Sequence, residues 1–543
     1  MIRKIVIGFI LLNILLDMKA QVTDQIAPMN SKVTGDVSNG YIFITQSTLD
    51  SADTYPTALC VMDSIGNPIF FKAVTKQTSA PYVRTQASDF KIQPSGLFSY
   101  STRLVSNKIG MYLMDNDFYI VDSIQCVDEI LTDGHDFIHT PDGSYHLVGT
   151  EERTMDLSSL YTDNGIQGNV DAVVTGNVIQ RFDVQKNLVF EWKSLDHFAV
   201  SDVYSFYFTD PSELDHSHYN SLEIDDDGNY ILSFRHLHEI TKVDALSGQI
   251  IWRLGGKNNQ FTFLGDTMRY SAQHDARRID NGNLTLFDNG TYNSSPVARA
   301  VEYQLDEVNM TATAVWQFHE PNGYNSQFIG NTNRLPNGNT LIDWGGAFPL
   351  TQTISFTEVD SESNVVMELD FVPNRYVSYR AVKHHLPFNI HRPQIICDGQ
   401  NMTLSAPTGY EEYHWNTGAL SKSIVITDTG AYQVWVNQGI GFLSSEKFVV
   451  SNLDSLCNAT NIVEIVKPKL WIYPNPATSH LIVEYETNTD MEGSIINSSG
   501  QKVLDLVLIS NFRNSSITID ISHLPSGNYL LQIGGSGKMF MKK

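Results

Sequence analysis

Three histidines that recur in one repeated phrase are the residues best suited to carry out chemistry in this sequence. His135, His218 and His274 each stand beside polar residues and shortly before a turn of Asp or Asn with Gly. The turn glycine follows His135 and His274 by eight residues and follows His218 by ten. A neutral imidazole can act as nucleophile, general base or metal ligand. Three imidazoles at one structural level therefore predict a shared polar site, whereas a single histidine in a strand is more often structural.

The elements that must position these histidines are the copies of the repeated phrase. About six copies lie between Gly35 and Lys383, each with an alternating strand, a tight turn and a second strand. The turns read PSG, PDG, DDG, DNG and PNG, which suits the positive φ of tight hairpins. Repeats of about four strands each favour a β-propeller over a β-sandwich. We therefore predict an all-β fold with a six-bladed propeller over residues 22–386.

In a propeller the first strand of each blade lines the central channel, so equivalent positions of successive blades meet near the axis. The count of eight from two other turn glycines arrives beside Asp89 and Asn331. His236 and His238 lie two residues apart on the expected second strand of their blade. That position predicts blade packing or a surface role for both.

Charge and the N-terminus limit the classes of function. The 543 residues carry a formal net charge of −24, and no basic stripe is present that could neutralise the phosphates of nucleic acid. Residues 1–20 combine Arg3 and Lys4 with a short apolar run and the letters MKA, which predicts a cleaved signal peptide. The apolar run is too short to span a bilayer comfortably. We expect a protein outside the cytoplasm with no membrane span after cleavage.

The four cysteines fit an oxidising compartment. None forms a C-x-x-C pair, so catalytic or zinc roles are not expected of them. Cys397 and Cys457 bracket one later segment and are the preferred disulfide. A pairing of Cys60 with Cys126 is left open.

Several phrases with a fixed order and spacing resemble the arylsulfotransferase family. They are HYNSLEIDDDGNYILSFR, ITKVDALSGQIIWRLGG, QHDARR, LFDNG, SPVARAVEYQLDE, NRLPNGNTLIDWGG and SYRAVK. The resemblance covers roughly Val22 to Leu386. It implies a six-bladed propeller outside the cytoplasm that moves a sulfuryl group from an aryl sulfate to a phenol. It also implies a sulfohistidine intermediate and no nucleotide donor, so no cofactor is expected.

The same resemblance suggests roles for individual residues. It matches His218 and His274 to two site histidines of the family. Arg299, in the ARAVEY phrase, is the predicted sulfate clamp, because a guanidinium offers a planar fork of donors. Arg277 and Arg278 are the alternatives for that role.

The remaining predicted site residues are one further catalytic histidine, His135, and three substrate-binding residues, Asn220, Asp275 and Asn331. Asn220 could orient an imidazole or donate to a sulfuryl oxygen, since it lies two residues after His218. An imidazole nucleophile would lose rate below about pH 6, where it takes up a proton.

The identity of the nucleophile stays open. The resemblance implies a histidine in a late blade, and the sequence has none between His319 and His384. His319, the pair His384–His385 or one of the earlier histidines could take that role. Two other functions remain: a non-catalytic surface propeller that binds carbohydrate or protein, and a hydrolase whose three histidines hold zinc. We expect no metal at this site.

Two further β modules follow the repeats. Residues 390–458 form short alternating stretches around Trp415, which is typical of an immunoglobulin-like β-sandwich. Residues 465–543 open with LWIYPNPATSHLIVEY and end with a GNYLLQI strand and a basic terminus. They resemble the C-terminal sorting domain of the type IX secretion system, a small β-sandwich. The resemblance implies the type IX machinery as a partner and a secreted or surface-attached protein.

Overall fold

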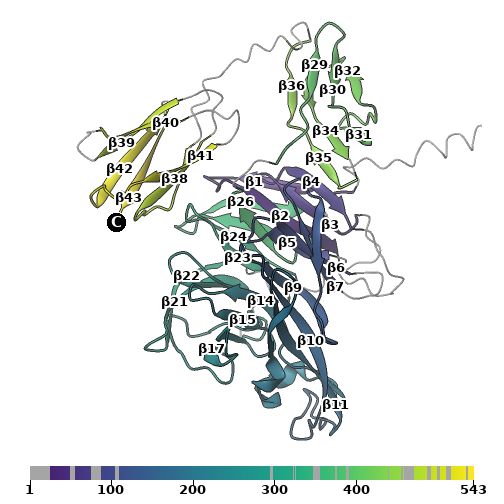
Figure 1. Cartoon of the computed structure of the whole chain (residues 1–543), viewed down its shortest axis with the longest axis vertical. Helices are drawn as coiled ribbons and strands as arrows, with labels where there is room; N and C mark the ends of the chain where they lie inside the picture. The colour runs from purple at the N-terminus through teal and green to yellow at the C-terminus, as the bar shows by residue number, and fades with distance from the viewer. Residues whose placement is uncertain are drawn as a thin grey trace, which may run out of the picture.

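The structure is a computed structural model, and Figure 1 labels its strands. It describes residues 25–48, 55–74, 87–103, 109–293, 297–321, 323, 326–346, 355–372, 376–386, 390–437, 439–453, 457, 470–485, 491–497, 502–508, 515–533 and 536–543. The predicted signal peptide, residues 1–20, lies outside the described residues. The regular structure of the described ranges is almost entirely strand, with three short 3-10 helices: η2 (Ser194–Asp196), η3 (Val200–Asp202) and η4 (Ser205–Tyr207). The all-β prediction is confirmed.

Six sheets of the described chain share one plan, in which four strands pair antiparallel with their neighbours. The first sheet contains β5 (Ala87–Ile92), β6 (Phe98–Arg103), β7 (Ile109–Met114) and β8 (Ile120–Ile124). The second contains β9 (Leu131–His139), β10 (Tyr145–Met155), β11 (Ala172–Phe182) and β12 (Leu188–Lys193). The third contains β14 (Tyr219–Ile224), β15 (Tyr230–Phe234), β16 (Glu239–Val243) and β17 (Ile250–Gly255). The fourth contains β19 (His274–Arg278), β20 (Leu284–Asp288), β21 (Arg299–Asp306) and β22 (Thr311–His319). The fifth contains β23 (Asn331–Arg334), β24 (Thr340–Asp343), β25 (Phe356–Val359) and β26 (Val365–Phe371). Three short strands extend these sheets at their outer parts: β13 (Glu213–Asp215) beside β11, β18 (Thr262–Leu264) beside β22 and β1 (Met29–Val33) beside β26.

The sixth sheet joins the two ends of the repeat region. It contains β2 (Tyr41–Thr48), β3 (Ala58–Met62) and β4 (Pro68–Ala73), and it is completed by β28 (Ala381–His384) and β27 (Tyr376–Val377), which both pair with β2. The first strands of the sheets contact one another in the order β5, β9, β14, β19, β23 and β28, and β2 contacts β5. Figure 1 shows the purple β2 and β3 beside the green β23, β24 and β26. The start and the end of the repeat region are thus held together by hydrogen bonds.

The turn glycines that define the repeat have the backbone that the sequence predicts. Gly96, Gly143, Gly228, Gly282 and Gly338 have φ of 88°, 84°, 81°, 83° and 93°. Each backbone N–H donates to the carbonyl three residues earlier, over 2.8–2.9 Å. An L side chain rarely adopts this left-handed conformation, so glycine is needed at each turn. These turns connect the first and second strands of five sheets.

The hydrophobic core of the repeat region lies between neighbouring sheets. Ile231 and Leu254 of one sheet pack with Leu284 and Val301 of the next, and all four side chains are fully buried. This burial stabilises the contact between the two sheets.

The residues after the repeats form two further groups of strands. The first group has β29 (Ile396–Asp398), β30 (Thr403–Ser405) and β32 (Ser423–Val425) in one sheet, β33 (Gly430–Tyr432) and β36 (Phe448–Val450) in another, and β31 (Glu412–Trp415), β34 (Val434–Asn437) and β35 (Phe442–Ser444) in a third set. β35 pairs with β4, so this group continues the β2–β4 sheet. Trp415 is buried, as predicted.

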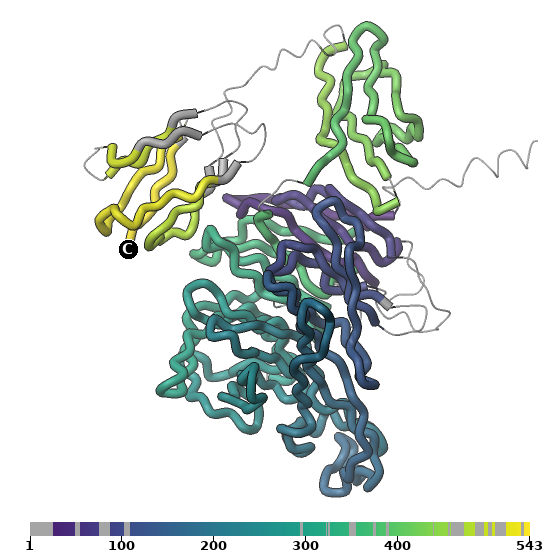
Figure 2. Tube along the Cα trace, in the orientation of Figure 1, coloured from purple at the N-terminus to yellow at the C-terminus, as the bar shows by residue number. Residues whose placement is uncertain are grey.

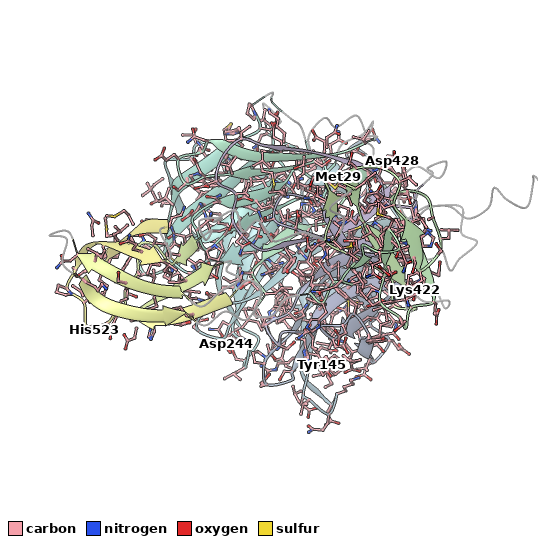
Figure 3. All side chains as sticks on the ribbon, turned by 90° about the horizontal axis from the view of Figure 1, so that it is seen from above. Met29, Tyr145, Asp244, Lys422, Asp428 and His523 are labelled. Carbon is pink, nitrogen blue, oxygen red and sulfur yellow. A yellow bond between two sulfur atoms is a disulfide. The ribbon has the colours of Figure 1, made fainter. Side chains whose placement is uncertain are left out.

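The second group carries the C-terminus. Its sheets contain β37 (Leu470–Tyr473), β38 (His480–Tyr485) and β41 (Ser515–Asp520), and β39 (Met491–Asn497), β40 (Lys502–Leu508), β42 (Gly527–Ile533) and β43 (Ser536–Lys542). Figure 2 traces it as the separate yellow lobe that ends at the C-terminus. Figure 3, in which His523 is labelled, shows this group as the yellow strands at the left.

The cysteines settle one prediction and one open choice. Cys397 and Cys457 form a disulfide across a Cα separation of 5.6 Å, as predicted. Cys60 and Cys126 are free thiols. Cys60 lies on β3, and burial raises its pKa to about 12. The pairing of Cys60 with Cys126 is therefore not formed.

Candidate active site

The candidate site lies where the first strand of a sheet begins and the second strand ends. In an antiparallel hairpin these two points are neighbours. His218 directly precedes β14, and its carbonyl accepts from the backbone N–H of Arg235, just past β15, over 2.9 Å. His274 opens β19, and Asn289 follows β20. Two kinds of residue therefore meet at this end of the sheets: histidines at strand starts and polar residues directly after second strands.

The rings of His135, His218 and His236 lie side by side. The centroids of His135 and His218 are 5.6 Å apart, and those of His218 and His236 are 4.4 Å apart in a stacked arrangement. His218 Nδ1 lies 2.6 Å from Oδ2 of Asp215, and His236 Nδ1 lies 2.7 Å from the Asp215 carbonyl oxygen. Burial opposes ionisation of Asp215, but the His218 imidazole holds the pKa of this carboxyl well below its usual value. One residue thus orients two imidazoles.

His135 is oriented by a neighbouring carboxylate. Its Nδ1 lies 2.5 Å from Oδ1 of Asp133, two residues earlier. Burial alone would lower the pKa of His135, but the charge of Asp133 and this hydrogen bond outweigh burial and raise it. The protonated form of His135 is therefore favoured relative to that of a free imidazole.

His274 has the opposite electrostatic setting. Its Nδ1 lies 2.7 Å from Oδ1 of Asn289. Asn289 Nδ2 donates to the Ile329 carbonyl over 3.0 Å, which fixes Oδ1 as the acceptor that faces the imidazole. Burial, and then the charge of Arg235, lower the pKa of His274 well below its ordinary value. His274 is therefore neutral, with its proton on Nδ1 and its lone pair on Nε2.

All four imidazoles share one orientation. In His135, His218, His236 and His274, Nδ1 faces an oxygen atom and donates to it. Among the described residues, no hydrogen bond reaches Nε2 of any of the four. Burial and the charge of His218 also lower the pKa of His236 well below its usual value. The cluster thus offers Nε2 atoms that can attack, accept or donate, according to protonation.

Arg235 supplies a cation beside the imidazoles. Its Nη2 donates to the Gln327 carbonyl over 3.0 Å, and its guanidinium carbon lies 5.2 Å from the centre of the Tyr207 ring. Within the described residues, its other guanidinium N–H groups carry no hydrogen bond. Its charge lowers the pKa of His274, His236 and His238 after burial has done so. A partly unused guanidinium beside the imidazoles of His236 and His274 is suited to hold an anion.

The same cluster contains a group that could hold a metal ion. Asp215, His218 and His236 each place one potential ligand atom within 4.8 Å of the others. However, Nδ1 of both histidines is already bonded to oxygen atoms of Asp215. A metal ion would therefore need the Nε2 atoms, whose orientation this hydrogen bonding favours.

A buried ion network lies beneath the imidazoles. Arg380 donates to Asp275 over 2.8 Å and to Asp136 over 3.2 Å. It also donates to Asp89 and, over 2.9 Å, to the carbonyl of His135. These partners lie on or beside the first strands of three different sheets. The network therefore fixes the backbone that carries the site.

The predicted substrate-binding residues lie in this supporting layer. Asn220 is fully buried and donates to the Gln273 carbonyl over 2.7 Å. Asp275 accepts from Arg380. Asn331 exchanges hydrogen bonds with the backbone of Ala381, over 3.0 and 2.8 Å, and so binds β23 to β28. The structure brings none of the three to the Nε2 face of the cluster by a described contact.

The structure does not bring Arg299 or His319 to the cluster. Arg299 is 1% exposed and donates to Asp288 over 2.9 Å and to Asp266 over 2.7 Å. A further bond to Gln317 uses Nη1. His319 pairs with Arg299 across β21 and β22. Arg299 begins β21 and His319 ends β22, the third and fourth strands of their sheet, and no described contact joins either residue to the imidazoles.

Sequence reasoning missed Arg235, Asp133, Asp215 and Asn289, and it misplaced His236. Residues 235–238 form the turn after β15, so the prediction that His236 and His238 lie on the second strand is wrong. The available signal was position: Arg235 and Asn289 directly follow second strands, and Asp133 and Asp215 lie two and three residues before a site histidine.

Two parts of the chain match models of known protein families. Residues 129–380 match the family model "Arylsulfotransferase (ASST)", and residues 471–543 match "Secretion system C-terminal sorting domain". The curated arylsulfate sulfotransferase AssT of Lelliottia amnigena is 31% identical over 133 residues, or 21% of this chain. The chain matches 22% of that relative's length.

Solved structures give more distant likenesses. A protein of unknown function from Bacteroides caccae is 13% identical, with a TM-score of 0.40 and coverage of 64% of this chain and 98% of that one. The β-propeller domain of Cps50 (Swd1) from Myceliophteria thermophila is 8% identical, with a TM-score of 0.32 and coverage of 70% and 96%.

The sorting domain also bears on location. It directs the chain to export, so the protein is secreted or attached to the cell surface. Among the described residues, the structure holds no helix with the length and hydropathy that crossing a membrane requires. Residues 129–380 of this chain therefore form an arylsulfotransferase family domain, and residues 471–543 form a C-terminal sorting domain for export through the type IX secretion system.

Proposed function

We propose that this chain is a secreted aryl-sulfate sulfotransferase that uses a histidine nucleophile and no nucleotide donor. In this proposal the six sheets are the blades of a propeller, and residues 390–458 are an immunoglobulin-like spacer. The observation that carries the proposal is the state of His274. A neutral imidazole with Nδ1–H bonded to Asn289 presents its Nε2 lone pair as a nucleophile.

The first step moves the sulfuryl group to the enzyme. His274 Nε2 attacks the sulfur of an aryl sulfate and forms an N–S bond. The bond between sulfur and the aryl oxygen breaks, and its electron pair leaves with the phenolate. His135, whose pKa is raised, then gives its proton from Nε2 to the phenolate as general acid.

The second step returns the enzyme to its starting state. An acceptor phenol gives its proton to Nε2 of His135 while its oxygen attacks the sulfur. An S–O bond forms, the N–S bond breaks, and the electron pair returns to His274 Nε2. No oxidant, nucleotide or metal enters either step, so the only substrates are an aryl sulfate and a phenol.

Charge on the sulfuryl oxygens needs fixed donors in both steps. Arg235 is the residue that we assign to this role in place of Arg299, because its guanidinium stands among the imidazoles with unused donors. Neutral His236 donates from Nδ1 to the Asp215 carbonyl, so its Nε2 carries a lone pair and is not one of these donors.

Purified full-length protein incubated with 4-nitrophenyl sulfate and phenol tests the proposal. Release of 4-nitrophenolate that depends on phenol, with phenyl sulfate as co-product, is the expected result. The His274→Ala variant should release none, and the His319→Ala variant, at a histidine outside the cluster, should act as wild type. A mature protein that releases no nitrophenolate under these conditions overturns the proposal.

The grouping of Asp215, His218 and His236 supports a second candidate, a zinc-dependent hydrolase. It would release 4-nitrophenolate without phenol and would lose this activity on treatment with a chelator. Metal analysis of the purified protein distinguishes the two, since the sulfotransferase needs no metal.

A further inference from the structure

A cluster of aromatic side chains borders the imidazoles, and the proposed chemistry does not use it. Tyr204, Phe206 and Tyr207 come from the segment around η4, and Tyr292 comes from the loop after β20. We call these four residues the aromatic wall. They belong to connections of two different sheets, so the fold and not one local segment brings them together.

The rings of the wall stack on one another. Phe206 and Tyr292 lie 3.9 Å apart between centroids and 17° from parallel. Tyr204 lies 5.4 Å from Phe206 at 17°, and Tyr207 lies 5.1 Å from Tyr292 at 74°. Offset-stacked and edge-to-face pairs at these separations are attractive. The wall is therefore an ordered surface of ring faces.

The wall is continuous with the imidazole cluster. Tyr207 stacks on His236 with centroids 3.9 Å apart, and His236 stacks on His218. The Tyr207 hydroxyl pairs with Nε2 of His238 over 3.1 Å. Burial lowers the pKa of His238 to about 3, so its Nε2 is neutral and accepts from the hydroxyl. The polar group of Tyr207 is thus used within the protein, and its ring lies next to the site.

The wall is not a closed core. Tyr204, Phe206 and Tyr207 are only partly buried, and Tyr292 is 42% exposed. Aromatic side chains of the sheet cores, such as Tyr230 and Phe234, are at most 1% exposed. Exposed ring faces that border a polar site are typical of a ligand subsite, in which few polar groups fix the ligand beside an apolar surface.

We propose that the aromatic wall binds the aryl ring of the donor and then of the acceptor phenol, with Phe206 and Tyr292 as the residues that set specificity. This inference rests on the proposed function and adds the substrate's ring to it. A planar ring against the wall would place its sulfate or hydroxyl toward His236, His218 and Arg235. An alkyl sulfate, which has the anion but no ring, lacks this contact.

Two variants and one control test the wall. Phe206→Leu and Tyr292→Ala remove stacking faces from partly exposed positions, and Tyr161→Ala removes a 56% exposed ring from the loop between β10 and β11. Circular dichroism and the melting temperature confirm that each variant is folded. For 4-nitrophenyl sulfate we expect KM to rise roughly three- to tenfold in each wall variant, with kcat at saturation little changed. The control should keep the wild-type KM.

Binding without turnover separates this inference from the proposed function. Free 4-nitrophenol is titrated into the full-length wild type and variants by calorimetry, with methyl sulfate as the probe that has no ring. Weaker 4-nitrophenol binding in the wall variants and unchanged methyl sulfate binding support the wall, whether or not the protein transfers sulfuryl groups. Equal KM and equal 4-nitrophenol affinity in wild type and wall variants overturn the inference and leave the proposed function standing. A wild type that does not bind 4-nitrophenol overturns it as well.

Discussion

Oδ1 of Asn289 lies 2.7 Å from Nδ1 of His274. The amide cannot turn over, because its Nδ2 donates to the Ile329 carbonyl and to Ser326 Oγ, each over 3.0 Å. The imidazole must therefore donate from Nδ1, and the lone pair stands on Nε2. Asn289 fixes the tautomer that nucleophilic attack requires.

Asn289→Ala removes this acceptor. The Ala272 carbonyl lies 3.1 Å from the same Nδ1 and can still accept a hydrogen bond. The imidazole is then oriented by this longer bond alone. We expect kcat to fall about 10- to 100-fold, the scale of losing a group that orients an imidazole. The measurement is steady-state transfer from 4-nitrophenyl sulfate to phenol. Asn283→Ala, at the opposite end of β20, is the matched control, and equal rates in the two variants would refute the role of Asn289.

The pH dependence of kcat/KM reports the two imidazoles separately. The pKa of His274 is lowered, so the nucleophile stays unprotonated when the pH falls below 6. The pKa of His135 is raised, so the general acid is lost only as the pH rises through that higher value. We expect rate to persist between pH 6 and 5 and to decline on the alkaline side. The loss below about pH 6 that the sequence predicts should not appear, and an acid limb near pH 6.5 would show an ordinary imidazole as nucleophile.

The repeated turns were predictable because glycine has a local physical reason at each of them. A left-handed φ requires it, so the phrase that ends in Gly143 or Gly282 marks a hairpin without any tertiary knowledge. His135 lies eight residues before Gly143 and His218 ten residues before Gly228, and the structure places their ring centroids 5.6 Å apart. The spacing within one repeat therefore predicts the positions of these histidines, but not their partners.

Partners from distant segments were not predictable. Arg299 reads as an available cation, yet Asp266 and Asp288 enclose it, and no local pattern reveals those contacts. Arg235 follows the strand Tyr230–Phe234, and no residue in the sequence marks where that strand ends. Because β15 stops at Phe234, the next residues turn back toward His218 and join the site.

Reduction of the Cys397–Cys457 disulfide should destabilise the module that it closes. The bond spans 60 residues, and the loss of this constraint on the unfolded chain amounts to about 4 kcal/mol. Because β35 pairs with β4, we expect the β2–β4 sheet to lose some protection from hydrogen exchange as well. Exchange in reduced and oxidised protein, compared with the distant β19–β22 sheet as control, measures both effects. Unchanged exchange throughout residues 390–453 would contradict this prediction.

Deletion of residues 471–543 should stop export, because these residues form the sorting domain. We expect the shortened protein in the periplasmic fraction and the full-length protein at the surface or in the medium. Immunoblots of the fractions measure this. The trapped protein should still transfer sulfuryl groups, since every residue of the candidate site precedes residue 471. Shortened protein in the medium at wild-type levels would show that another segment carries the export signal.

Arg380 should be the substitution that costs the repeat region most stability. It is 4% exposed and bonds to Asp89, Asp136 and Asp275. Arg380→Met leaves buried carboxylates with one cation fewer, a change that destabilises by about 3–5 kcal/mol. Arg380→Lys keeps the charge, so this variant should be more stable than Arg380→Met. The lysine cannot reach all the carboxylates and the His135 carbonyl at once, so we expect a kcat below that of the wild type and little change in KM. Urea unfolding and steady-state kinetics measure the two effects. A fully active and fully stable Arg380→Met variant would show that the carboxylates are neutralised by other groups.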